Sequence, residues 1–87
     1  MGATTIESAA ALELGERGTP NLLRWRRRTY RVTDAPTPLE DALACALTHP
    51  LPARGWRFQG TSDQDGETLV FDVLATGAGW RVVKTYR

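Results

Sequence analysis

Residues 56–86 read WRFQGTSDQDGETLVFDVLATGAGWRVVKTY, and this stretch decides the fold. Two turn signals, Asp65-Gly66 and Gly77-Ala78-Gly79, divide it into three runs in which apolar and polar residues nearly alternate. Alternation with a period of two indicates a strand, and a glycine-bearing pair between two such runs indicates a tight hairpin. The stretch therefore predicts a three-stranded antiparallel meander.

Two-residue loops at these turns would fix the register of the meander. Phe58 is then opposite Val73 in the first hairpin, and Val73 is opposite Val82 in the second. A slip by one residue in either hairpin would move half of the bulky residues to the other face. The residues predicted to share one face are Trp56, Phe58, Leu69, Phe71, Val73, Trp80, Val82 and Tyr86.

The segment 22–33 is also strand-like, but its alternation is broken. Trp25 and Tyr30 fall on opposite faces if the strand is continuous. A tight turn or bulge near Arg26-Arg27 would restore the pattern, giving one strand through Trp25 and a second from Arg28 to Thr33. A continuous strand with polar residues on both faces is the alternative.

Between these segments, residues 37–47 have the pattern of a helix. Thr37-Pro38-Leu39-Glu40 is a capping box with proline at the first helical position. An apolar stripe follows at helical spacing and would cover the aromatic face of the sheet, and Pro50 and Pro52 would end the helix. The stripe consists of Leu39, Ala42, Leu43, Ala46 and Leu47.

The predicted fold is therefore α+β, an antiparallel meander with one helix packed on one face. Gly60 lies in a central register, so a partly rolled, SH3-like or small-barrel sheet is an alternative. Residues 1–20 are predicted to be an N-terminal tail, partly helical or disordered, because the apolar face of the alanine-rich run is thin. Residues 21–87 would form a single small domain.

The composition favours an ordinary globular protein. Of the 87 residues, 41% are hydrophobic and 24% charged, with no apolar run near the ~20 residues that a membrane span needs. One cysteine excludes an intramolecular disulfide, and the first residues lack the basic start of a secretory signal. These features predict a cytoplasmic location.

Catalytic and metal-binding patterns are weak in this sequence. Cys45 and His49 are four residues apart near the end of the predicted helix, without a third group to orient them as a nucleophile pair. Asp63 and Asp65 are explained by turn chemistry better than by a calcium loop. We therefore predict a protein that is not an enzyme and that uses no metal and no cofactor.

Clustered arginines interleaved with aromatic residues are the strongest functional signal. Arginine binds phosphate, and an aromatic ring can stack on a base. The formal net charge of only +1 and the pI near 8.0 weaken this interpretation, and Trp25 and Tyr30 are better explained as core residues. The candidate nucleic-acid-binding residues are Arg24, Arg26, Arg27, Arg28, Arg31, Arg57 and Arg81.

A protein-interaction or self-associating domain is the alternative. Val70, Leu74 and Val83 would form a half-apolar patch on the second face of the sheet. The last strand, or the strand near Leu23, would offer an edge to a further strand from another chain. A homodimer or an adaptor could use either feature.

The pattern Leu23-x-Trp25, then Arg28-x-Tyr30-Arg31-Val32, with the late run Gly79-Trp80-Arg81-Val82-Val83 and Tyr86, resembles a group of short uncharacterised actinobacterial proteins. The resemblance covers residues 22–33 and 67–87. It departs from that group at Arg27, where a turn glycine is usual, and in the added segment 37–47. It implies a small β-rich fold and carries over no catalytic residue.

Overall fold

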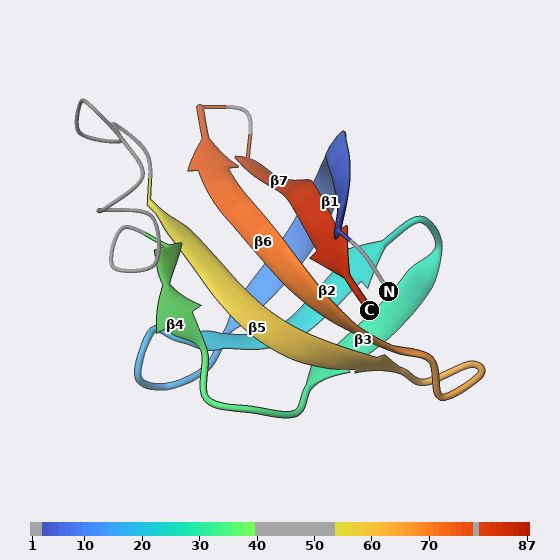
Figure 1. Ribbon diagram of the computed structural model, residues 1–87. Coiled ribbons are helices and arrows are strands. Elements are labelled where there is room, and N and C mark those ends of the chain that lie inside the picture. Colours follow the sequence, from blue (N-terminus) through green and yellow to red (C-terminus); the bar gives the residue numbers. More distant parts are fainter. Residues whose placement is uncertain (1–2, 40–53, 78) are drawn as a thin grey trace.

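A single antiparallel sheet closes on itself to form a barrel in the computed structural model, which describes residues 3–39, 54–77 and 79–87 (Figure 1). The strand order is β3-β2-β1-β7-β6-β5, and pairing between β3 and β5 closes the ring. A short strand, β4, adds to β5 beside the ring. The strands are β1 (Ala3–Leu14), β2 (Pro20–Trp25), β3 (Arg28–Val32), β4 (Thr37–Pro38), β5 (Gly55–Ser62), β6 (Thr68–Thr76) and β7 (Gly79–Tyr86).

The predicted α+β fold is wrong. Among the residues that the structure describes, every regular element is a strand, and the sheet closes completely instead of rolling partly under a helix. Thr37 and Pro38, predicted to cap and begin the helix, form β4 and pair with Arg57 and Trp56. The extended backbone that a residue before proline favours suits an N-cap and a strand equally, so the pairing with β5 decides the outcome at Thr37. The rest of that helix prediction, residues 40–47, lies outside the described residues.

The N-terminal segment is a strand, although a partly helical or disordered tail was predicted. The longer, N-terminal part of β1 pairs with β7, from Ala3 opposite Tyr86 to Ala10 opposite Trp80, so the two ends of the described chain lie side by side (Figure 1). The remainder, from Ala11 to Leu14, pairs with β2. Partners at the other end of the sequence therefore override the weak helical preference of the alanine run.

The barrel interior contains the residues that alternation assigned to one face, with one exception. Phe58, Phe71, Val73 and Val82 are fully buried, and Trp56 and Trp80 pack against the same cluster. The exception is Tyr86, because β7 bulges at Val83 and the register shifts between Asp72 and Val73. Thr85 therefore points into the barrel in place of Tyr86, which lies on the outer side with Asp72.

The first hairpin has a longer loop than predicted. Its register places Phe58 opposite Phe71 instead of Val73, and the loop consists of residues 63–66, with Gly66 at a φ of 74°. The difference is a shift by two residues, which changes every partner but leaves each side chain on its predicted face. The second hairpin has the predicted register near its turn, with Ala75 opposite Trp80.

The hairpin of β2 and β3 confirms the turn predicted at Arg26-Arg27. Trp25 pairs with Arg28, so these two arginines form the loop, and Trp25 and Tyr30 both point into the core. β2 pairs with β1 and β3, and β7 pairs with β1 and β6. The prediction that β2 or β7 is an edge strand is therefore wrong, because barrel closure gives both strands two neighbours.

Leu39 was predicted to cover the aromatic face of the sheet, but the structure places it elsewhere. It is 1% exposed and lies on the outer side of the barrel, where it and Leu74 pack over Gly55. A Cβ atom at Gly55 would lie 2.8 Å from Leu39 Cδ1, 2.6 Å from Leu74 Cδ2 and 2.6 Å from the carbonyl oxygen of Val73. Gly55 therefore permits the close approach of β5, β6 and Leu39.

Replacement of Gly55 tests this packing. Gly55→Ala should lower the free energy of unfolding by about 1–3 kcal/mol, because a backbone oxygen cannot move aside as a flexible side chain can. The measurement is urea unfolding followed by tryptophan fluorescence. Gly77→Ala is the control, since its Cβ would meet nothing within 4 Å. Equal effects of the two substitutions would contradict the proposed packing.

Candidate functional site

The turn between β2 and β3 holds two arginines in an unusual backbone conformation. Arg26 and Arg27 have φ angles of 53° and 64°, in the left-handed region that a type I′ hairpin turn requires at both central positions. Asparagine and glycine adopt this conformation readily, whereas other residues are destabilised there by about 1–2 kcal/mol each. The chain therefore places two bulky cations where a small turn residue would be more stable.

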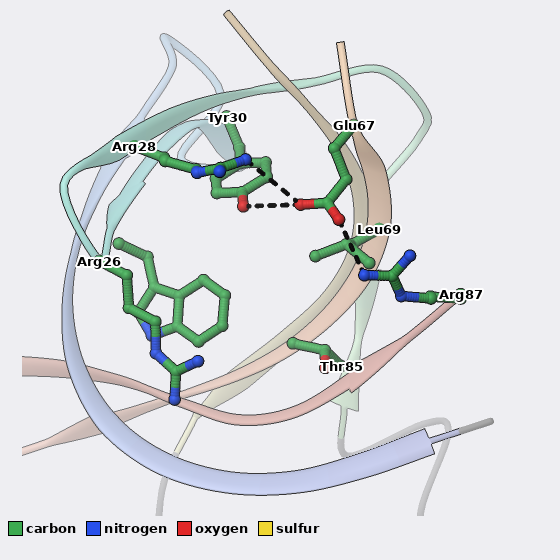
Figure 2. A pocket seen from close by; sticks show the side chains of 8 residues that line it. Arg26, Arg28, Tyr30, Glu67, Leu69, Thr85 and Arg87 are labelled. Atoms are coloured by element: carbon green, nitrogen blue, oxygen red, sulfur yellow. Dashed lines mark hydrogen bonds and ion pairs between the residues drawn. The ribbon is translucent and has the colours of Figure 1, made fainter. Parts of the chain in front are cut away.

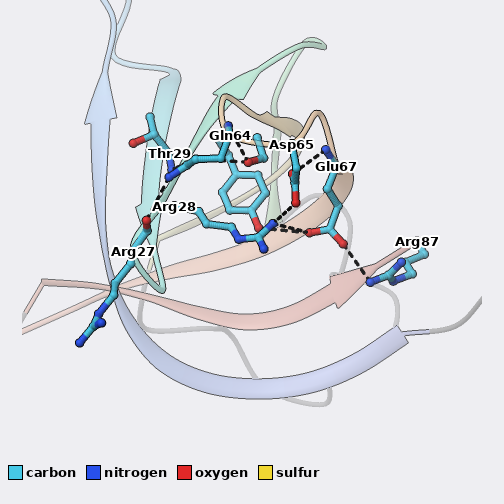
Figure 3. Close-up of polar contacts among 9 residues, drawn as sticks. Arg27, Arg28, Thr29, Gln64, Asp65, Glu67 and Arg87 are labelled. Carbon is cyan, nitrogen blue, oxygen red and sulfur yellow. Dashed lines mark hydrogen bonds and ion pairs between the residues drawn. The ribbon is translucent and has the colours of Figure 1, made fainter.

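The two arginine side chains take different directions from this turn. The Arg26 guanidinium lies over the ring of Trp25, with Cζ 4.4 Å from the ring centroid. Arg27 points away from the neighbouring polar cluster, and within the described part of the chain its side chain has no ion-pair partner (Figure 3). One guanidinium is thus held in place and the other is accessible.

A cavity of about 330 Å³ lies beside this turn, at one end of the barrel (Figure 2). Its wall is formed by buried side chains from four strands, β2, β3, β6 and β7. Charged side chains surround its entrance. The lining residues are Trp25, Arg26, Arg28, Tyr30, Glu67, Leu69, Thr85 and Arg87.

Glu67 connects the charged groups around this cavity. Its carboxylate accepts hydrogen bonds from Arg87 Nη2 at 2.9 Å and from the Tyr30 hydroxyl at 3.4 Å, and lies 3.6 Å from Arg28 Nη1 (Figure 3). Asp65 forms a second ion pair with Arg28 and raises the pKa of that guanidinium. Burial, and then the Glu67 carboxylate, raises the pKa of Tyr30. The entrance therefore already contains one carboxylate among its cations.

Two of the predicted nucleic-acid-binding residues lie on the outer side of the same hairpin. Arg24 forms an exposed ion pair with Glu13 at 3.2 Å, and Arg31 forms one with Asp63 at 3.3 Å. Exposed pairs of this kind contribute little stability and can exchange partners. Arg24 and Arg31 are therefore partly neutralised but remain accessible.

Arg57 has a structural role in this barrel. Its Nε and Nη2 atoms donate to the two oxygens of Asp72 at 2.7 and 3.0 Å, and Nη2 also donates to the Tyr86 hydroxyl. Asp72 is 4% exposed, and the Tyr86 hydroxyl donates to it at 2.8 Å. Burial, followed by the Asp72 carboxylate, raises the pKa of Tyr86. The Arg57 guanidinium is thus bound to a buried carboxylate of the same chain and does not present those donors to a phosphate.

The structure does not bring all of the predicted arginines together. Arg81 lies on β7, where it pairs with Leu74 of β6, and β7 is three strands away from β3 in either direction around the ring. Arg57 pairs with Asp72 and is not in the same row as Arg81, contrary to the predicted register. The arginines that do gather are those of the β2–β3 hairpin: Arg24, Arg26, Arg27, Arg28 and Arg31.

The predicted interaction patch is smaller than the sequence indicated. Val70, Leu74 and Val83 are each half-buried. Leu74 packs against Leu39 over Gly55, and Val83 is the residue at the bulge of β7. Part of this apolar surface is therefore already covered by the chain itself.

Sequence reasoning missed four residues of the cavity: Glu67, Leu69 as a lining residue, Thr85 and Arg87. A signal for Glu67 was present, because it has the same parity as Leu69 and Phe71 and lies at the start of their strand. Alternation thus placed Glu67 at the end of the core. No signal existed for Thr85, which points inward only because of the bulge.

Comparison with protein-family models, with curated proteins and with solved structures finds no match to this chain. The resemblance to actinobacterial proteins therefore stays a prediction. Over the described ranges, no three His, Cys, Asp or Glu side chains gather as a metal site would require. The same ranges contain no helix long and apolar enough to cross a membrane. Cys45 and His49 lie outside the described residues.

The strained turn predicts a stabilising substitution. Replacing Arg26-Arg27 with Asn-Gly should raise the free energy of unfolding by about 1 kcal/mol, because Asn-Gly suits a type I′ turn. Urea unfolding of the double variant Arg26→Asn/Arg27→Gly measures the gain. Arg17→Asn, an exposed substitution in the loop between β1 and β2, should leave stability nearly unchanged. A loss of stability in the double variant would show that the Arg26–Trp25 contact outweighs the strain.

The two tyrosines predict a loss of stability at alkaline pH. The pKa values of Tyr30 and Tyr86 are raised from 10.0 in the folded chain, so the unfolded chain releases these protons first. Their contribution is complete below about pH 10 and decreases as the pH rises through the raised pKa values. Urea unfolding across this range should show the decline, and Tyr86→Phe should make it shallower. An unchanged decline in that variant would contradict the assignment.

Proposed function

We propose that this protein is a non-enzymatic module that binds single-stranded nucleic acid at the barrel end formed by the β2–β3 hairpin. Arg26 and Arg27 at the turn would contact backbone phosphates, with Arg24, Arg28 and Arg31 adding positive charge along the same hairpin. The aromatic cavity beside the turn would receive a base. The cytoplasmic location predicted from the sequence belongs to this proposal.

The observation that carries the proposal is the conformation of Arg26 and Arg27. Strained backbone that persists against a more stable alternative is characteristic of functional positions. Here the strain falls on two adjacent cations at the tip of a hairpin, and neither of them has an ion-pair partner among the described residues. The contact with Trp25 offers a structural reason for arginine at position 26, but no side-chain contact among the described residues accounts for arginine at position 27.

The shape of the site favours single strands over duplexes. Guanidinium planes and aromatic side chains bind unstacked bases, which a double helix does not present. The cavity of about 330 Å³ is at the small end of the range for ligand sites, roughly 300–1,000 Å³, and suits a group of single-nucleotide size.

The alternative function, a protein-interaction domain with Val70, Leu74 and Val83 at its interface, has less support. Leu39 already packs against Leu74, and neither β2 nor β7 offers an edge for strand addition. The proposed function therefore rests on the hairpin end of the barrel.

Salt-dependent titration tests the proposed function. A fluorescent single-stranded oligonucleotide should bind with an affinity that falls steeply with salt, and a duplex of the same sequence should bind more weakly. In Arg26→Asn/Arg27→Gly the slope of log K against log salt should be shallower by about 1.4, that is, two phosphate contacts at about 0.7 each. The double variant should therefore be more stable and bind less tightly.

Arg17→Asn/Arg54→Asn is the control for net charge, because it also removes two positive charges and both residues are exposed away from the hairpin turn, Arg17 in the loop between β1 and β2 and Arg54 just before β5. Its slope should remain close to that of the unmodified protein. Equal losses in both variants would indicate a diffuse charge effect. No binding at low salt and high micromolar protein would contradict the proposed function.

A further inference from the structure

The cavity at the hairpin end is closed at its inner side. Phe71 is fully buried behind it, and its ring contacts Tyr30 at 4.8 Å and Trp25 at 5.6 Å between centroids. The packed rings of Trp25, Tyr30 and Phe71 form its inner side, and we take the cavity to open only toward the charged entrance. A blind cavity of this size accommodates the end of a chain better than its middle.

The charged groups at the entrance converge on one position. The ionised side chains that line the cavity are Arg26, Arg28, Arg87 and Glu67, which sum to a charge of +2. The Glu67 carboxylate lies between Arg28 and Arg87 and accepts a hydrogen bond from Tyr30 (Figure 2). The protein thus places its own anion at the point where cationic and hydroxyl donors meet. Asp65 pairs with Arg28 without lining the cavity.

We infer that this cavity binds the terminal nucleotide of a single strand, with its base among Trp25, Tyr30 and Leu69 and its terminal phosphomonoester near Arg28 and Arg87. A phosphomonoester carries about −1.5 to −2 charges and three strong acceptor oxygens, whereas an internal phosphodiester carries one charge. The +2 lining therefore complements a phosphorylated end better than an internal link. This inference rests on the proposed function and adds recognition of the strand end.

Glu67 acts in this arrangement as an internal competitor of the phosphate. Its two oxygens occupy donors of Arg28, Arg87 and Tyr30 that the phosphate needs. The phosphate binds by displacing the carboxylate from these donors. The carboxylate therefore lowers the affinity of the cavity for the phosphorylated end.

The experiment compares four oligonucleotides of one sequence with the full chain: a 5′-phosphate, a 3′-phosphate, hydroxyls at both ends, and a closed circle. Fluorescence anisotropy gives each dissociation constant at one salt concentration. One of the two phosphorylated strands should bind about tenfold more tightly than the hydroxyl-ended strand and the circle. The phosphorylated strand that binds more tightly identifies which end enters the cavity.

Two variants connect this preference with the cavity. Glu67→Gln keeps the size of the side chain and removes its charge, so the preference for the phosphorylated end should increase severalfold. Arg87→Gln should reduce the preference. Glu16→Gln, which changes the net charge as Glu67→Gln does but lies in the exposed loop between β1 and β2, should leave the preference unchanged.

Each outcome separates the inference from the proposed function. If all four oligonucleotides bind equally and with salt dependence, strand binding stands and the end-binding inference is overturned. If a nucleoside monophosphate binds, and binds more tightly to Glu67→Gln, while no oligonucleotide binds, the cavity assignment stands and the proposed function fails. If neither oligonucleotide nor mononucleotide binds, both are overturned.

Discussion

The contact between Tyr30 and Phe71 across Gly60 is the constraint on which the rest of the structure depends. Their ring centroids are 4.8 Å apart, and a Cβ atom on Gly60 would lie 3.1 Å from both Tyr30 Cβ and Phe71 Cε2. Absence of a side chain at Gly60 thus lets β3 approach β5 and complete the ring. Closure removes open edges, and it fixes the β2–β3 hairpin over the end of the barrel, where the cavity forms.

Local sequence predicted the faces of the strands better than their partners. Alternation is a property of each strand alone, so Phe58, Phe71 and Val82 could be assigned to the core without knowledge of the register. A four-residue loop in place of a two-residue loop changes the register by an even number and leaves this assignment intact. The bulge at Val83 inserts one residue, and that odd change turned Tyr86 outward and Thr85 inward.

The elements that sequence reasoning missed depend on contacts between distant segments. The alanine-rich run has some helical preference by itself, but in the fold Ala3 lies opposite Tyr86, and such pairing outweighs small differences in propensity. Thr37-Pro38-Leu39-Glu40 matches a capping box equally well, yet Thr37 pairs with Arg57 in β4. A local motif predicts local structure only when no long-range partner competes for the same backbone.

The same limit applies to the candidate site, and it explains why counting arginines overestimated the positive surface. The sequence shows cations in a row, but it does not show that Asp63, Asp65 and Asp72 are placed against Arg31, Arg28 and Arg57. Once these pairs are taken into account, the strongest remaining signal is the hairpin turn, where strain and charge coincide on Arg26 and Arg27. Ion pairs therefore neutralise part of the basic stretch, and the positive charge of the hairpin turn remains at one end of the barrel. The aromatic cavity lies at that same end.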